Sequence, residues 1–89
     1  MHFVFTYEPN PAARAGHSIS DQPAHRAWIA KLWDERRLIL AGPFIETTGG
    51  MAIVEARDRA DAEALLQEDP AIANGTFIAS IRAMQVIYK

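Results

Sequence analysis

The sequence predicts an α+β fold in which four strands and two helices follow one another in the order β-α-β-β-α-β. Short segments rich in aromatic and β-branched residues lie at both ends of the chain. Two longer segments have apolar residues at helical spacing, and glycine or proline separates most segments. The 89 residues, 49% hydrophobic and 22% charged, are typical of one globular domain spanning residues 1–89.

The first element is a strand at residues 2–8. Aromatic side chains alternate with smaller or polar ones from His2 to Tyr7, and Pro9 lacks the backbone donor that further ladder pairing would need. Residues 10–20 have no apolar periodicity and contain two further breakers, so we expect a loop there.

The first helix is expected from Pro23 to about Arg36, with Ser20 or Asp21 as its N-cap. Counting from His25, the apolar stripe of a core-facing helix continues at offsets of three, four, seven and eight: Trp28, Ile29, Leu32 and Trp33. Both tryptophans are therefore predicted to lie in the core, and His25 shares their face.

A strand follows at residues 38–41, because this continuous apolar run is too short for a helix and Gly42-Pro43 bounds it. Phe44 and Ile45 are expected to continue it beyond the bend. Residues 47–50, Thr-Thr-Gly-Gly, then form the turn of a hairpin, and residues 51–56 form the returning strand.

The second helix is expected at residues 59–68, capped by Asp58 and ended by Asp69-Pro70. Asn74-Gly75 predicts a turn, and residues 76–88 predict a long final strand. This order of elements is that of a ferredoxin-like fold, in which an antiparallel sheet carries two helices on one face.

The face of the sheet without helices is expected to be unusually apolar. The residues assigned to it are Val4, Leu38, Leu40, Ile53, Ile78, Met84 and Val86. A second subunit is the natural cover, so we predict a homodimer in which two sheets pack face to face. The alternative is a register shifted by one residue, which would turn these side chains towards the helices.

The composition argues against several classes of function. A net charge of −2, with no basic cluster larger than Arg36-Arg37, argues against nucleic acid and acidic membranes as partners. The absence of cysteine excludes disulfides and thiolate catalysis. No nucleotide-binding motif occurs, and His2, His17 and His25 lack metal-site spacing, so we predict no cofactor and no metal. Without a targeting signal or an apolar run of about 20 residues, we expect a cytoplasmic protein.

His25 is the candidate for chemistry, because the unperturbed pKa of a histidine, about 6.5, suits a general acid or base at neutral pH. Such a histidine needs a carboxylate to orient its second ring nitrogen, and Asp69 is the candidate. A histidine on an apolar face is also commonly a hydrogen-bonded core residue, and an aspartate before proline commonly begins a turn, so both alternatives stay open.

Several short motifs together resemble the YCII-related (YciI-like) family. They are Pro23-Ala24-His25, Leu38-Ile39-Leu40-Ala41-Gly42-Pro43, Gly50, and Asp69-Pro70 followed by Gly75 and a terminal strand. The resemblance implies a ferredoxin-like dimer of the α/β-barrel type, with a pocket centred on His25 and Asp69. Family members often carry an arginine where this chain has Gln22, which leaves Arg26 or Arg14 as substitutes.

The resemblance also implies an activity, since one relative is a dehydrochlorinase and related barrels include isomerases and monooxygenases. By this analogy the chain is a small cofactor-independent lyase or isomerase, in which His25 moves a proton and Asp69 orients it. The expected substrate-binding residues are Phe5, Tyr7, Trp28, Gly42 and Pro43. The alternatives are a non-catalytic small-molecule-binding or regulatory dimer, and a purely structural dimer with no cavity near His25.

Overall fold

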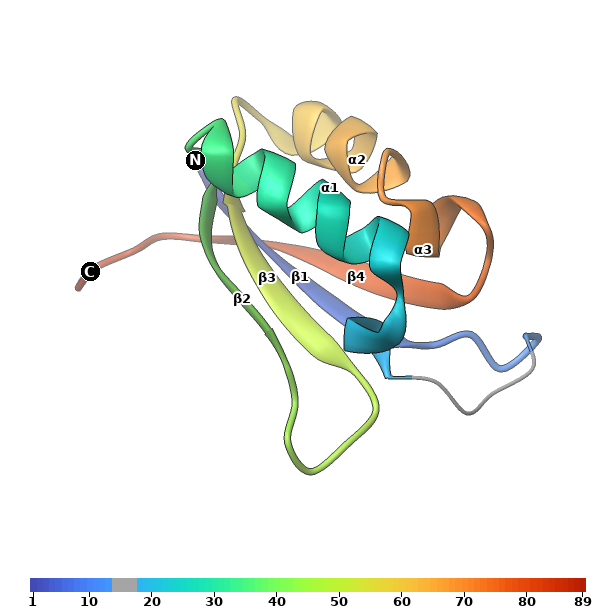
Figure 1. Cartoon of the computed structure of the whole chain (residues 1–89). Coiled ribbons are helices and arrows are strands. Elements are labelled where there is room, and N and C mark those ends of the chain that lie inside the picture. Colours follow the sequence, from blue (N-terminus) through green and yellow to red (C-terminus); the bar gives the residue numbers. More distant parts are fainter. Residues whose placement is uncertain (14–17) are drawn as a thin grey trace.

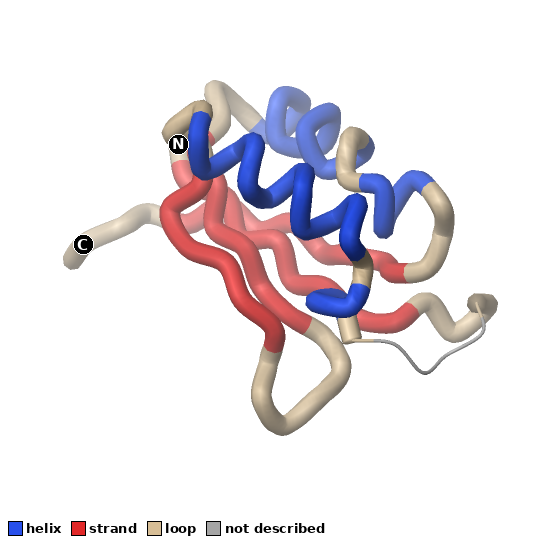
Figure 2. Tube along the Cα trace, viewed as in Figure 1, coloured by secondary structure: helices blue, strands red, loops and turns tan. Residues whose placement is uncertain are grey.

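The computed structural model describes residues 1–13 and 18–89, so Arg14 and His17 lie outside the described residues. The chain forms two layers, a four-stranded sheet and a layer of helices that covers one of its faces (Figures 1 and 2). The elements are β1 (His2–Pro9), the short 3₁₀ helix η1 (Ile19–Asp21), α1 (Pro23–Asp34), β2 (Leu38–Pro43), β3 (Gly50–Glu55), α2 (Arg59–Gln67), α3 (Pro70–Ala73) and β4 (Phe77–Met84).

The sheet has the strand order β2-β3-β1-β4, and every neighbouring pair is antiparallel. This arrangement confirms the ferredoxin-like fold. β1 is a central strand with partners on both sides, and Tyr7 lies opposite Gly50 on β3 and Ala79 on β4. The backbone of β1 is therefore held by hydrogen bonds on both sides, which fixes the positions from which its side chains project.

The core lies between the sheet and the helices. Alternate residues of β1 point into it, and Phe3, Phe5 and Tyr7 are each no more than 2% exposed. The buried residues that other elements contribute to this cluster are Ile19, Trp28, Leu32, Leu38, Ala52, Val54, Ala56, Ala62, Leu65, Leu66, Ala71 and Phe77.

The apolar stripe of α1 is narrower than the spacing predicted. His25, Trp28 and Leu32 are buried, but Trp33 is 61% exposed, so its assignment to the core was wrong. The physical reason is that α1 packs on a single sheet, and residues at the edge of a helical stripe then face solvent.

The ends of α1 also differ from expectation. Its N-cap is Gln22, which makes no side-chain capping bond, whereas the Ser18 side chain caps η1. At the other end, the backbone N–H groups of Arg36 and Arg37 donate to the carbonyls of Trp33 and Leu32. This pattern is a Schellman motif, and it ends the helix at Asp34 instead of Arg36.

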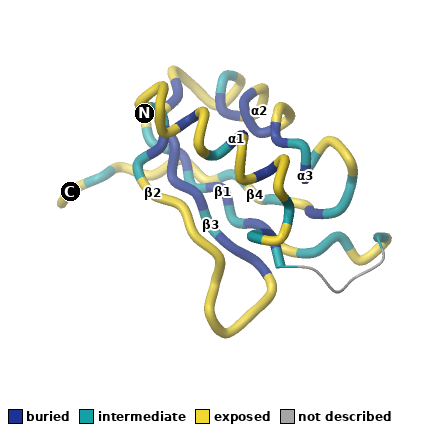
Figure 3. Tube along the Cα trace, in the orientation of Figure 1, coloured by how far each residue is buried: buried dark blue, intermediate teal, exposed yellow. Residues whose placement is uncertain are grey.

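Three assignments to strands need correction. Phe44 and Ile45 lie in the loop that joins β2 and β3. β4 ends at Met84, and the last five residues run away from the body of the molecule (Figures 1 and 3). Leu38 faces the helices and belongs to the core, so its assignment to the open face was wrong.

Val86, also assigned to the open face, lies beyond the end of β4, so that assignment was wrong, whereas the other residues assigned to this face, apart from Leu38, lie on it. Val4 pairs with Ile53, and the side chains of Leu40, Ile78 and Met84 are 46%, 40% and 38% exposed. The face without helices therefore carries several exposed apolar residues among polar ones. Among the described residues, none of the helices has the length and apolarity needed to cross a membrane.

Candidate functional site

Asp69 is a fully buried carboxylate at the junction of α2 and α3. It occupies the N-cap of α3, where its Oδ1 accepts a hydrogen bond of 3.0 Å from the backbone N–H of Ala71. Pro70 follows at the first position of that helix, where a missing N–H costs nothing. The N-cap position thus fixes the Asp69 side chain through Oδ1. Its second oxygen, Oδ2, can accept hydrogen bonds from residues distant in the sequence.

His25 is the first of these partners. It lies in the first turn of α1, and its Nδ1 is 2.7 Å from Asp69 Oδ2. The residue is only 7% exposed. An ionised carboxylate can only accept hydrogen bonds, so Nδ1 carries the proton that bridges the two groups. The predicted pairing of His25 with Asp69 is therefore present as a buried contact.

Tyr7 is the second partner, and the sequence did not predict this contact. Its hydroxyl donates a hydrogen bond of 2.7 Å to the same oxygen, Asp69 Oδ2. Its ring meets the His25 ring edge to face, with centroids 5.3 Å apart. Burial of the Tyr7 hydroxyl, followed by the negative charge of Asp69 and their hydrogen bond, raises the pKa of Tyr7 far above its ordinary value of 10.0.

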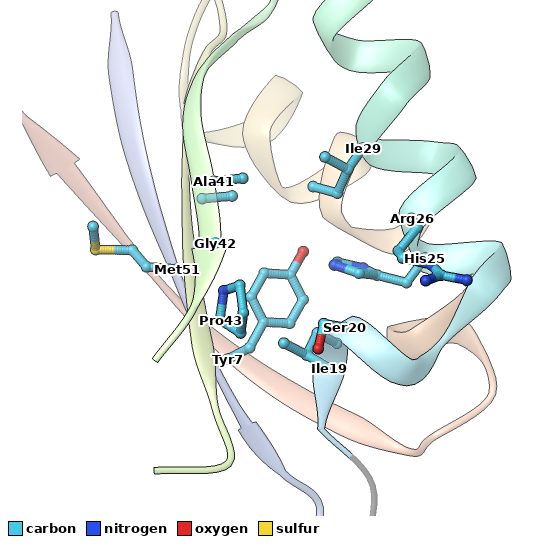
Figure 4. A pocket seen from close by; sticks show the side chains of 11 residues that line it. Tyr7, Ile19, Ser20, His25, Arg26, Ile29, Ala41, Gly42, Pro43 and Met51 are labelled. Atoms are coloured by element: carbon cyan, nitrogen blue, oxygen red, sulfur yellow. The ribbon is translucent and has the colours of Figure 1, made fainter. Parts of the chain in front are cut away.

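A cavity of about 240 Å³ lies directly in front of this group. Its walls come from β1, η1, the start of α1, β2 and β3, and the residues that line it are Tyr7, Ile19, Ser20, His25, Arg26, Ile29, Ala41, Gly42, Pro43, Met51 and Ala52. Figure 4 shows the Tyr7 hydroxyl and the His25 ring directed towards each other at the back of the cavity. The structural alternative, which required no cavity near His25, does not agree with this geometry.

The predicted site residues fall into two groups. Tyr7, Gly42 and Pro43 line the cavity together with His25. Phe5 and Trp28 are instead core residues that do not reach the cavity wall, although the Trp28 ring lies 6.1 Å from the His25 ring. Asp69 lies behind the wall, where its Oδ2 is hydrogen-bonded by His25 and Tyr7 among the described residues.

Sequence reasoning missed the contribution of η1. Ile19 and Ser20 close one side of the cavity, but their segment was expected to be an irregular loop. The signal was present in the chain, because Ser18 and Asp21 form a capping box that marks the start of a short helix. Arg26, considered as a substitute for an arginine at position 22, does line the cavity.

Among the described residues, no three histidine, aspartate or glutamate side chains converge as ligands for a metal ion. The polar groups at the cavity are instead those of His25, Tyr7, Ser20 and the Arg26 side chain. Such a set can orient a small molecule and move a proton.

The YCII-related domain family matches residues 1–85. The uncharacterized protein YjpA of Bacillus subtilis (strain 168) is 35% identical over 52 residues, which are 58% of this chain and 61% of YjpA, so the match spans less than two thirds of that relative.

A similar solved structure is the 5-chloro-2-hydroxyhydroquinone dehydrochlorinase TftG from Burkholderia phenoliruptrix AC1100, in complex with 2,5-dihydroxybenzoquinone. It matches with a TM-score of 0.74 and 20% identity, covering 96% of this chain and 94% of TftG. This likeness supports the fold, and the family match covers nearly the whole chain. The chain belongs to the YCII-related domain family.

Proposed function

We propose that the chain is a cofactor-independent lyase or isomerase that moves a proton on a small organic molecule, with His25 as the acid or base. The observation that carries this proposal is the position of His25, which lines the cavity while the buried Asp69 engages its Nδ1. Nε2 is therefore the nitrogen left for a bound molecule, and its orientation is set before any ligand arrives.

In the proposed step, Nε2 of His25 takes a proton from a carbon or oxygen of the substrate. The imidazolium that forms is stabilised by the negative charge of Asp69, 2.7 Å from Nδ1. The electron pair left on the substrate then either accepts the proton at another atom or expels a leaving group. The first outcome is an isomerisation and the second an elimination.

The size and lining of the cavity support a compact substrate. A cavity of about 150 Å³ binds benzene in a protein core, so about 240 Å³ leaves room for a single ring with small substituents. Most of the lining is apolar, which suits the faces of such a ring. The ligand of TftG, 2,5-dihydroxybenzoquinone, is a molecule of this size class.

The test is exchange of substrate protons with heavy water, followed by NMR across a panel of lactones, enolisable ring ketones and chlorinated hydroquinones. We expect wild-type protein to catalyse exchange or turnover of one class, and His25→Gln to lower the rate by about 10²- to 10⁴-fold. Asp69→Asn should act in the same direction. His2→Gln is the matched control, because His2 lies on β1 outside the cavity.

Binding of a panel member without exchange or turnover would contradict the enzymatic proposal and favour a non-catalytic binding or regulatory module. Equal exchange rates for wild type and a folded His25→Gln variant would reject His25 as the acid or base. Circular dichroism of each variant distinguishes these results from unfolding.

We also propose that the chain forms a homodimer through the open face of the sheet. The support is a set of exposed apolar residues on this face, Leu40 on β2 and Ile78 and Met84 on β4, together with Val4 and Ile53 on the central strands, since exposed apolar residues on a sheet face commonly mark an interface. The face is the same on both copies, as a two-fold dimer requires.

A further inference from the structure

The hydrogen bonds at Asp69 are distributed unevenly between its two oxygens. Oδ1 accepts one neutral donor, the backbone N–H of Ala71 at 3.0 Å. Oδ2 accepts two shorter bonds at once, from Tyr7 and from His25, each of 2.7 Å. The two side chains therefore compete for the electron density of a single oxygen.

Tyr7 can only be the donor in its bond, because an ionised carboxylate accepts and does not donate. Its proton is therefore committed to Asp69, and the phenol is a poor source of a proton for a ligand in the cavity. Tyr7 lines the cavity, but its hydroxyl acts on the carboxylate behind the wall.

The Tyr7 hydroxyl is also held in place. Its strand is paired on both sides, and its backbone carbonyl lies against Gly49, where a Cβ would not fit. The ring is 2% exposed and packs on His25. Such a donor has little freedom to leave Asp69 when a ligand binds.

Few other charges face His25. The titratable or charged side chains that line the cavity are Tyr7 from β1, Arg26 from α1 and His25 itself, and η1, β2 and β3 contribute none. Behind the wall, Asp69 is the carboxylate in contact with the ring. Tyr7 and Asp69 therefore have the largest electrostatic effect on the Nδ1 proton of His25.

We propose that Tyr7 is a positioning residue that limits how strongly Asp69 holds the proton on His25. A hydrogen bond to an ionised carboxylate stabilises its negative charge, so the hydroxyl of Tyr7 makes Oδ2 a weaker acceptor for the bond from His25 Nδ1. In a dyad without Tyr7, Asp69 would accept a stronger bond from His25 Nδ1 and would stabilise the imidazolium more strongly. This inference rests on the proposed function for its catalytic meaning, although the hydrogen-bond competition exists without a substrate.

The test replaces the donor and follows the Nδ1–H proton of His25 by NMR in ligand-free protein. In Tyr7→Phe the bond from His25 to Asp69 should shorten, and this resonance should move downfield. In the proton-exchange assay at pH 6, kcat/KM should fall roughly three- to tenfold, and the loss should shrink as the pH rises to 8 because neutral His25 is restored. Tyr88→Phe is the matched control, because Tyr88 is 94% exposed.

A second measurement covers the case in which Tyr7→Phe does not fold. The chain has two tyrosines, so 3-fluorotyrosine incorporated into the Tyr88→Phe background labels Tyr7 alone. The fluorinated phenol is the stronger donor, and the Nδ1–H resonance should then move upfield, opposite to the effect of phenylalanine. An unchanged resonance in a folded Tyr7→Phe variant, or a shift of the same sign with both replacements, would overturn the role of Tyr7.

The two proposals fail in different ways. Absence of turnover by wild-type protein across the panel counts against the proposed function and leaves the NMR comparison intact. Turnover that depends on His25 but keeps the same pH profile in Tyr7→Phe counts against the positioning role alone.

Discussion

Leu38 and Leu40 are two residues apart on β2 but face opposite sides of the sheet. A regular strand would place both on one face, but the pairing with β3 shifts register between them, so that Leu38 lies opposite Val54 and Leu40 opposite Ile53. Leu38 is 8% exposed within the core, and Leu40 is 46% exposed on the open face. The irregularity thus supplies one apolar residue to each side of the sheet.

This placement leads to a prediction about association. The double variant Leu40→Lys and Ile78→Lys should convert a dimer into a monomer, because it buries like charges at the proposed interface. Both side chains are exposed in the single chain, so its fold should tolerate the change. Light scattering coupled to size exclusion measures the mass. Trp33→Lys is the control, since Trp33 is exposed on α1, and a monomeric wild type would reject the dimer.

A second prediction concerns the end of α1. Arg36 has a φ of 60°, in the left-handed region that favours glycine. Arg36→Gly should therefore raise the free energy of unfolding by about 1 kcal/mol, because it removes backbone strain that outweighs the added entropy of the unfolded chain. Urea denaturation measures this difference. Arg36→Ala retains the strain and should bring no comparable gain; equal stability of the two variants would show that the strain is negligible.

A third prediction concerns Gly49, which packs against the strand that carries Tyr7. A Cβ at this position would collide with the backbone carbonyl oxygen of Tyr7, and a backbone atom on a central strand cannot move cheaply. Gly49→Ala should lower the free energy of unfolding by about 1–3 kcal/mol. Gly42→Ala is the matched control, because a Cβ at Gly42 meets nothing within 4 Å. Thermal or urea unfolding of the two variants compares them, and equal stability would contradict the close packing.

A fourth prediction concerns alkaline pH. Because the pKa of Tyr7 is raised in the folded protein, ionisation of this phenol is easier in the unfolded chain. The stability that Tyr7 contributes is fully present below its unfolded pKa of 10.0 and is lost as the pH rises above it. Tyr7→Phe should be less stable than wild type at pH 8 by about 1–3 kcal/mol, for loss of a buried hydrogen bond.

The difference in unfolding free energy between wild type and Tyr7→Phe should narrow above pH 10. Only wild type carries a phenol at position 7, and this phenol ionises when the chain unfolds. Urea denaturation between pH 8 and 11 follows this difference. A constant difference across that range would mean that the Tyr7 hydroxyl is not held in its protonated form.

A fifth prediction concerns acid. Asp61 in α2 accepts a hydrogen bond of 2.9 Å from the backbone N–H of Arg57 and one of 3.1 Å from the Arg37 guanidinium. The backbone bond is the largest effect and lowers the pKa of Asp61 below its ordinary value of 3.8. Desolvation opposes it, and the charges of Arg37 and Arg57 lower the pKa further. A lowered pKa means that this contribution to stability is present above pH 3.8 and is lost as the pH falls below it.

Asp61→Asn should therefore be less stable than wild type at pH 7, and the two melting temperatures should converge as the pH falls towards 3. Glu63→Gln is the control, because Glu63 is half exposed and pairs with Arg59 on the surface. If the melting temperature of Asp61→Asn were still below that of wild type at pH 3, the effect of the substitution would be due to packing instead of charge.

The order of the four strands and the two longer helices was predicted correctly, since strand alternation, helical spacing and glycine or proline breaks are local properties of the chain, whereas the short helices η1 and α3 were not predicted. The two residues of the buried dyad were also candidates from the sequence. His25 is a polar residue on an apolar helix face, and Asp69 precedes a proline at a helix boundary, so both positions stand out against their neighbours. Each anomaly marks a residue whose partner lies elsewhere in the fold.

Contacts between side chains from different elements, other than that of His25 with Asp69, could not be predicted from the sequence. Tyr7 and Asp69 are 62 residues apart, and the alternation of β1 indicates only that Tyr7 faces inward. Likewise, the register shift between Leu38 and Leu40 depends on how β2 pairs with β3, and the exposure of Trp33 depends on how much of α1 the sheet can cover. Periodicity identifies the buried face of each element, whereas contacts between faces follow from the packing of all elements together.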